Sequence, residues 1–288
     1  MNAFKLNLLS LLTLTCVGLA AGEPKVGVME SAFGNGCVVE SIALAKEAGY
    51  SGVQIKTGSL DENGVLTLAN PKLIQSFKDA AAREQIQIVS LCAGSLNGVN
   101  CWDPESRKKA ISIASQSIKA CRELDVRILL VPFFGKADFR DDPKGNEYDA
   151  VVSMFRELLP LAVENNVVLG VESYAKKTVI ERLLKDVNHP NLKVYYDTGN
   201  MQTVEEDIYA VIEEWGPDKI CQIHLKPYNS PQVVWGKGDT DISKLASAIK
   251  ASGYEGWFVF ESGPGKKTLG VPHAKENREA IGALTGKL

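Results

Sequence analysis

The sequence has no excess of basic residues. Its 288 residues contain 32 Lys and Arg against 35 Asp and Glu, which gives a formal net charge of −3. Proteins that bind nucleic acid need clustered positive charge to meet the phosphate backbone. We therefore do not expect nucleic acid to be the principal ligand.

The sequence also lacks closely paired cysteines. None of its six cysteines forms a Cys-x-x-Cys pair, which argues against a zinc ribbon or a thioredoxin-like motif. One of them, Cys16, falls in the leading apolar segment, and the other five are scattered through apolar runs. That scatter indicates small buried side chains, and an odd number leaves at least one thiol unpaired. Cys92 and Cys101 are the local candidates for a disulfide.

A glycine-rich phosphate-binding turn is missing after the first apolar strand. Residues 29–36 read MESAFGNG, which lacks the G-x-G-x-x-G spacing of a doubly wound dinucleotide-binding sheet. Nor does any linker, repeat of low complexity or run of like charge divide the chain. These absences favour a single α/β domain of another architecture.

The chain has one long apolar run, and it stands at the start. A short segment with one positive charge precedes residues 6–21, which carry no charge, and small residues and Glu23-Pro24 follow. This order is typical of a secretory signal peptide, which we place at residues 1–22, although a retained anchor is the alternative. We expect a protein exported to the bacterial periplasm or secreted, with no membrane association after cleavage.

From residue 25 onward, short β-branched runs alternate with longer segments of helical spacing. Most of the strand-like runs are apolar throughout, as in parallel strands covered on both faces. They span 25–29, 52–56, 86–92, 127–133, 167–172, 192–197, 220–226 and 257–261. Candidate helices between them include 38–48, 71–84, 105–124 and 147–165. Eight such alternations predict one (β/α)8 TIM barrel over residues 23–288.

Four consecutive predicted strands end in side chains that can bind a metal. They carry Glu172, Asp197, His224 and Glu261, with separations of 25, 27 and 37 residues that each suit one strand–helix unit. Catalytic groups of such barrels come from the carboxyl ends of the strands, so these four should share one rim. Three carboxylates placed together would repel one another strongly without a cation. The pattern therefore predicts a metal site.

Each of these residues also has an ordinary interpretation. A glutamate at a strand end is commonly a solvated carboxylate or a helix-start acceptor, and a histidine in an apolar strand is commonly a hydrogen-bonded core residue. Asp197 could simply form a turn with residues 198–200. Four such coincidences on successive strands are less plausible than one, which favours the metal site.

The same residues carry a resemblance to a known family. Glu172, Asp197 in Tyr-Asp-Thr-Gly-Asn, His224 in Ile-His-Leu-Lys and Glu261 in Phe-Glu-Ser-Gly resemble the xylose isomerase-like sugar (phosphate) isomerases and epimerases. The runs at 48–55 and 236–241 are also similar to segments of that family, and the likeness covers nearly all of the chain after the leading segment. It implies one divalent metal held by the four side chains, with both glutamates acting as acid and base.

The ligand set indicates which metal to expect. Three carboxylates and one imidazole are mostly hard donors that favour Mn²⁺ or Mg²⁺, with Co²⁺ or Zn²⁺ as alternatives. A metal on a carbonyl and its neighbouring hydroxyl would acidify the adjacent C–H and stabilise an enediolate. Glu172 and Glu261 on opposite sides of that plane could then remove and return a proton.

The sequence departs from the ketose epimerases of this family at two positions. The His that follows the metal Asp by three residues is Asn200 here, and the Arg expected shortly after the metal His is absent. Lys226 or Lys237 could supply the positive donor instead, and Lys56 could point into the same mouth. We list Asn200, Lys226, Lys237 and Lys56 as candidate substrate-binding residues.

Three functions fit these observations. The first is an isomerase or epimerase of an unphosphorylated sugar or keto-sugar, because sugar phosphates are cytoplasmic and export is expected. The second is a lyase that eliminates the aglycone of a 3-keto-glycoside through the same enediolate. The third is a non-catalytic sugar-binding barrel. Apurinic endonuclease barrels hold three metals with many more histidines than the three found here. A homo-oligomer is possible.

Overall fold

A computed structural model describes residues 25–34, 36–141, 144–228, 234–237, 240–261 and 270–288. The expected signal peptide at 1–22 and part of the run at 236–241 lie outside these residues. Within them, no helix has the length and apolar character needed to cross a membrane.

The strands of the described chain form a closed parallel barrel in the order of the sequence. They are β1 (Val26–Met29), β2 (Gly52–Lys56), β3 (Gln87–Cys92), β4 (Ile128–Phe133), β5 (Val168–Ser173), β6 (Leu192–Asp197), β7 (Ile220–Leu225) and β8 (Phe258–Phe260). The first and last strands pair with each other and close the ring. The (β/α)8 prediction is therefore confirmed, because each expected strand-like run overlaps one of these strands.

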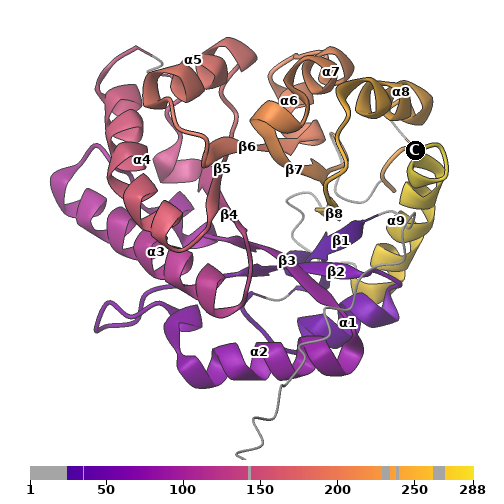
Figure 1. The fold of residues 1–288 in the computed structure, drawn as a ribbon, viewed down its shortest axis with the longest axis horizontal. Helices are drawn as coiled ribbons and strands as arrows, with labels where there is room; N and C mark the ends of the chain where they lie inside the picture. The colour runs from indigo at the N-terminus through magenta and orange to yellow at the C-terminus, as the bar shows by residue number, and fades with distance from the viewer. Residues whose placement is uncertain (1–24, 35, 142–143, 229–233, 238–239, 262–269) are drawn as a thin grey trace, which may run out of the picture.

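Helices surround the strands (Figure 1). The longer ones are α1 (Ser41–Glu47), α2 (Pro71–Glu84), α3 (Pro104–Glu123), α4 (Asn146–Glu164), α5 (Lys177–Val187), α7 (Ile208–Lys219), α8 (Ile242–Ser252) and α9 (Gly270–Thr285). The polar residues that precede α2, α3 and α8 cap them: Asn70, Asp103 and Asp241 each accept a backbone N–H of the first turn. A proline in the first turn of α2 and α3 fits these starts.

Short helices follow the carboxyl ends of several strands and shape the rim there. They are η1 (Glu30–Phe33), η2 (Thr67–Ala69), η3 (Gly94–Gly98), η4 (Gly135–Ala137) and α6 (Thr198–Thr203). Of these, η1 and α6 begin at the residue directly after β1 and β6. The rim is therefore more ordered than the sequence pattern predicts.

The apolar core has two parts. The larger cluster lies between the strands and the surrounding helices, and a smaller one that includes Met29, Leu130 and Val259 fills the barrel interior. Cys92 belongs to the inner cluster and Cys101 to the outer one, and both are free, buried thiols. The proposed disulfide between them is therefore wrong. The two residues are close in sequence, but they pack on opposite faces of the barrel wall.

Candidate metal centre

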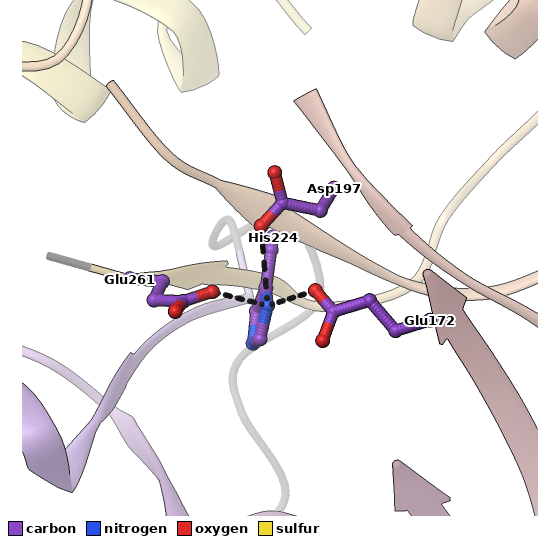
Figure 2. Close-up of side chains that lie close together, drawn as sticks. All are labelled: Glu172, Asp197, His224 and Glu261. Atoms are coloured by element: carbon purple, nitrogen blue, oxygen red, sulfur yellow. Dashed lines mark hydrogen bonds and ion pairs between the residues drawn. The ribbon is translucent and has the colours of Figure 1, made fainter. Parts of the chain in front are cut away.

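Four side chains from successive strands meet at the carboxyl end of the barrel. Glu172 lies in β5, Asp197 ends β6, His224 lies in β7, and Glu261 directly follows β8. One ligand atom from each falls within 4.8 Å of all the others. Figure 2 shows the three carboxylates directed at the imidazole, with Glu172 and Glu261 on opposite sides of it. The structure thus brings together the quartet that the sequence singled out.

The imidazole presents Nδ1 to all three carboxylates. This nitrogen lies 3.1 Å from Glu172 Oε1, 3.0 Å from Glu261 Oε2 and 3.6 Å from Asp197 Oδ2. The side chains of His224 and Asp197 are 1% and 0% exposed, and that of Glu261 is 18% exposed. Water can therefore reach this cluster from the Glu261 side, and the other ligands are withdrawn from it.

The two carboxylate oxygens of Asp197 have different contacts. Oδ1 accepts the backbone N–H of Asn200 at 2.7 Å and so caps α6. Oδ2 is buried and makes no hydrogen bond, although His224 Nδ1 and Lys226 Nζ lie 3.6 and 3.7 Å from it. A buried anionic oxygen without a hydrogen bond is costly, and a directly bound cation offsets that cost. The turn and the ligand interpretations of Asp197 therefore both hold, each for one oxygen.

The donor set fits a divalent cation. Atoms bound at about 2.0–2.2 Å from one ion lie within about 4.4 Å of one another, so the observed cluster needs shifts of only a few tenths of an ångström. Lys226 Nζ lies 3.5 Å from Glu261 Oε1 and 3.7 Å from Asp197 Oδ2. The three carboxylates and this ammonium sum to −2, which a divalent ion balances. The four residues are therefore a candidate site for a hard divalent metal.

In the Tyr-Asp-Thr-Gly-Asn segment, local contacts explain the residue type at each position after the aspartate. Thr198 Oγ1 donates to the carbonyl of His224 at 3.3 Å and accepts the N–H of Lys226 at 3.2 Å, so it ties β6 to β7. A Cβ at Gly199 would lie 3.1 Å from both Cγ and the carbonyl oxygen of Lys226. Asn200 Nδ2 donates to Glu172 Oε1 at 3.3 Å, and its Oδ1 accepts Lys226 Nζ at 3.1 Å. The segment therefore positions two ligands and one lysine.

The charged groups of the site shift one another's protonation. Burial raises the pKa of Glu172 to about 7, although the charge of His224 opposes this. Burial also acts to raise the pKa of Glu261, but the charge of Lys226 and the hydrogen bond from His224 outweigh it and lower that pKa. The three carboxylates together overcome the effect of burial on His224 and raise its pKa.

The structure separates the four candidate substrate-binding residues. Asn200 and Lys226 are buried and contact the quartet directly. Lys237 is exposed and pairs with Glu276 of α9 at 3.3 Å, away from the cluster. Lys56 ends β2, and its backbone N–H donates to Glu30. It pairs in register with Cys92, the last residue of β3, which places it on the same rim.

The sequence interpretation missed a fourth carboxylate at this rim. Glu30 directly follows β1 and is fully buried. Its Oε1 accepts the backbone N–H groups of Cys37 and Lys56, each at 2.6 Å, and its Oε2 accepts that of Val38 at 3.3 Å. Burial raises the pKa of Glu30 against these donors. Ser41 Oγ also donates to Oε2 at 3.3 Å. Both oxygens are therefore taken by donors of the fold, so Glu30 holds the rim together and offers no free oxygen to a metal.

A polar layer beneath the quartet was also missed. Gln222, Tyr195 and Gln54 each stand two residues before His224, Asp197 and Lys56. Residues two apart on a strand share a face, so a polar residue at this spacing in an apolar strand lies one layer deeper in the barrel. This spacing is the signal that could have identified them.

Fold and site together define a TIM barrel whose described residues contain one candidate metal centre, built on β5 to β8. The chain belongs to the xylose isomerase-like TIM barrel family, whose sequence model matches residues 42–285.

Its relatives include sugar epimerases. L-ribulose-5-phosphate 3-epimerase UlaE of Salmonella heidelberg (strain SL476) is 22% identical over 257 residues, which cover 82% of this chain and 86% of the relative. Crystal structures of 3-keto-D-glucoside 4-epimerase YcjR from E. coli and of IOLI protein with a binding zinc atom superpose with TM-scores of 0.72 and 0.71. They are 18% and 16% identical, cover 90% and 92% of this chain, and are themselves covered to 98% and 99%. At this identity the structural likeness shows the shared fold.

Proposed function

We propose that this protein is a metal-dependent isomerase or epimerase of an unphosphorylated carbonyl sugar, acting through an enediolate. The observation that carries the proposal is the placement of Glu172 and Glu261 on opposite sides of His224 in one buried cluster (Figure 2). A planar intermediate held between two carboxylates exposes one face to each. One carboxylate can remove a proton from its face, and the other can return a proton to the opposite face.

Other residues of the cluster support this chemistry. When bound, a divalent ion would polarise the carbonyl and make the adjacent C–H more acidic. Asn200 holds Glu172 at a fixed position, which keeps that carboxylate aimed into the cluster. The ammonium of Lys226, held by the Asn200 carbonyl, would face the negative charge that develops on the substrate oxygens.

Two observations favour a substrate without phosphate. The leading segment has the pattern of an export signal, which would take the protein to the periplasm or out of the cell and away from phosphorylated metabolites. Two of the candidate substrate-binding lysines are already matched with carboxylates: Lys226 with Asp197 and Glu261, and Lys237 with Glu276. A phosphate group would have to compete with these partners.

Elimination from a 3-keto-glycoside is the second candidate. It begins with the same proton removal, and the electron pair then expels the group on the neighbouring carbon. The position of Lys226 favours it, because an ammonium 3.5 Å from the Glu261 carboxylate could stabilise a departing oxygen. The keto-glucoside in the name of one structural relative gives this substrate class further support.

Incubation in D₂O with Mn²⁺ tests the proposal. Purified protein is given a panel of free ketoses and aldoses and, separately, 3-keto-glycosides with a chromogenic aglycone. An isomerase or epimerase yields a product sugar with deuterium at the reacting carbon, detected by mass spectrometry and NMR.

Aglycone release without any epimerised sugar would replace the first candidate by the lyase. No turnover with either panel, combined with sugar binding that survives in Glu172→Gln and Glu261→Gln, would instead indicate a non-catalytic sugar-binding barrel.

A further inference from the structure

His224 makes a second contact on the side of the ring away from the carboxylates. Its Nε2 lies 3.0 Å from Oε1 of Gln54, a fully buried residue of β2. The ring therefore spans two layers of the barrel interior. Nδ1 faces the three carboxylates of the upper layer, and Nε2 faces an amide oxygen of the lower one.

This geometry assigns the proton of the neutral ring. A metal can bind Nδ1 only through a free lone pair, so the single proton of a metal-bound imidazole must sit on Nε2. There it meets an acceptor, the Gln54 carbonyl oxygen. A group that holds the far nitrogen of a ligating histidine fixes both its tautomer and the rotation of the ring.

The Gln54 amide is itself held by hydroxyl groups. Its Nε2 donates to Tyr195 OH at 2.8 Å and to Ser90 Oγ at 2.9 Å. Tyr195 OH in turn donates to Gln222 Oε1 at 2.6 Å. The donors therefore follow one order, from His224 to Gln54, from Gln54 to Tyr195 and from Tyr195 to Gln222. Each group accepts a hydrogen bond from the group before it and donates one to the group after it. Turning the amide over would place its N–H₂ against the imidazole N–H and lose that bond.

Packing supports the same orientation. The rings of Tyr195 and His224 meet edge to face, with centroids 4.4 Å apart. Tyr195 belongs to the interior cluster, whereas the next residue, Tyr196, packs in the outer core and donates its hydroxyl to the carbonyl of Ile208. Only the first of these two adjacent tyrosines belongs to the chain of hydrogen bonds that reaches His224.

We propose that Gln54 is a positioning residue that orients His224 for metal binding, and that Tyr195 holds Gln54 in place. The inference deepens the proposed metal centre and rests on its metal-binding part, not on the reaction catalysed. It gives the first half of the barrel, which supplies none of the quartet, a direct part in metal affinity through β2. Gln54 is neutral, so it adds no charge to a cluster that Lys226 and a divalent ion already balance.

Titration calorimetry of the metal-stripped protein with Mn²⁺ tests the inference. Gln54→Leu keeps the approximate volume and removes the acceptor, and it should weaken Mn²⁺ binding about 10–100-fold. Gln54→Glu keeps an oxygen toward Nε2 and should therefore bind Mn²⁺ more tightly than Gln54→Leu. Tyr195→Phe should weaken binding less than Gln54→Leu, and Tyr196→Phe is the matched control with unchanged affinity.

A second readout is the visible absorption of bound Co²⁺. It should differ from the parent in Gln54→Leu and match it in Tyr196→Phe, since a change in the direction of the imidazole alters the ligand field. A merely structural role for Gln54 would lower thermal stability without changing either measurement.

Parental Mn²⁺ affinity in a folded Gln54→Leu would overturn the inference and leave the metal centre intact. Should that variant fail to fold, equal affinities in Tyr195→Phe and Tyr196→Phe would overturn it. A parent protein that binds no Mn²⁺ or Co²⁺ would overturn the metal centre and this inference together. Metal binding without sugar turnover would affect only the proposed function.

Discussion

Two buried glutamates at opposite sides of the barrel rim have different roles because their contact partners differ. Glu30 directly follows β1, and Glu172 lies near the end of β5, so both are carboxylates at the carboxyl end of an apolar strand. Both are buried, and burial raises the pKa of each. Glu30 is surrounded by backbone N–H donors, whereas Glu172 faces two further carboxylates and an imidazole.

The two halves of the barrel differ in the same way, one supplying metal-capable side chains and the other supplying structural contacts. Strands β5 to β8 carry the quartet, and the described part of β1 to β4 contributes a backbone clamp at Glu30 and hydrogen-bonding support at Gln54. A carboxylate whose oxygens both accept hydrogen bonds from neighbouring groups of the fold stabilises that fold. One whose oxygen points at other anions costs stability unless a cation joins it. The contact partners therefore distinguish a structural glutamate from a functional one, whereas residue type and burial are the same for both.

The largest expected effect is on kcat, in variants of the two glutamates proposed to transfer protons. We expect Glu172→Gln and Glu261→Gln each to lower kcat about 10²–10⁴-fold, because each removes one proton-transferring carboxylate. Steady-state kinetics on the substrate found in the D₂O screen measures this. Glu62→Gln, at an exposed position, serves as the matched control and should retain parental kcat. Full activity in Glu172→Gln would contradict the assignment of the catalytic carboxylates to the half of the barrel formed by β5 to β8.

Metal addition should stabilise the protein through the second half of the barrel. Mn²⁺ at about a hundredfold its Kd should add about 2.7 kcal/mol to the free energy of unfolding. This corresponds to a rise in Tm of roughly 5–10 °C for a domain of this size. Differential scanning fluorimetry of the metal-stripped protein measures the shift. Asp197→Asn, which weakens the orphaned ligand, should lose most of it, and an equal rise in that variant would contradict the assignment.

Glu30→Gln should affect stability and leave metal binding alone. The amide keeps one oxygen for Cys37 and Lys56 but turns an N–H₂ group toward the backbone N–H of Val38. Leaving such a donor without an acceptor costs about 1–3 kcal/mol. Urea denaturation should show this loss, with Mn²⁺ affinity unchanged. Weakened Mn²⁺ binding in the folded variant would mean that Glu30 belongs to the metal centre.

The barrel and the quartet could be predicted because both depend on short-range pattern. Apolar strands that alternate with helices close in one way, and ligands at the ends of successive parallel strands must share a rim. Glu30 could not be classified from sequence, because most of its partners are backbone N–H groups, which no residue type reveals. Lys237 was misleading for a related reason: α9 brings Glu276 beside it from far along the chain.

The smallest effect concerns a third glutamate, on the surface of the helical layer. Glu181 in α5 accepts hydrogen bonds from Lys177, Trp215 and Lys219. Burial acts to raise its pKa, but these donors outweigh burial and lower it to about 2. A lowered pKa contributes stability above about pH 4.5 that disappears as the pH falls toward 2.

Removing that contribution should cost little, because the side chain is 28% exposed and solvent screens it. We expect Glu181→Gln to lose about 1 kcal/mol at pH 6 and less at pH 3, measured by urea denaturation at both values. A loss that grows as the pH falls would contradict the sign of the shift.

Calorimetric titration of Mn²⁺ into metal-stripped parent protein and into His224→Ala tests the central claim most directly. If the four side chains form one metal centre, the parent binds one ion per chain, and the variant, which lacks the ligand shared by all three carboxylate contacts, binds it far more weakly. A parent that takes up no ion, or a variant with unchanged affinity, would contradict the account.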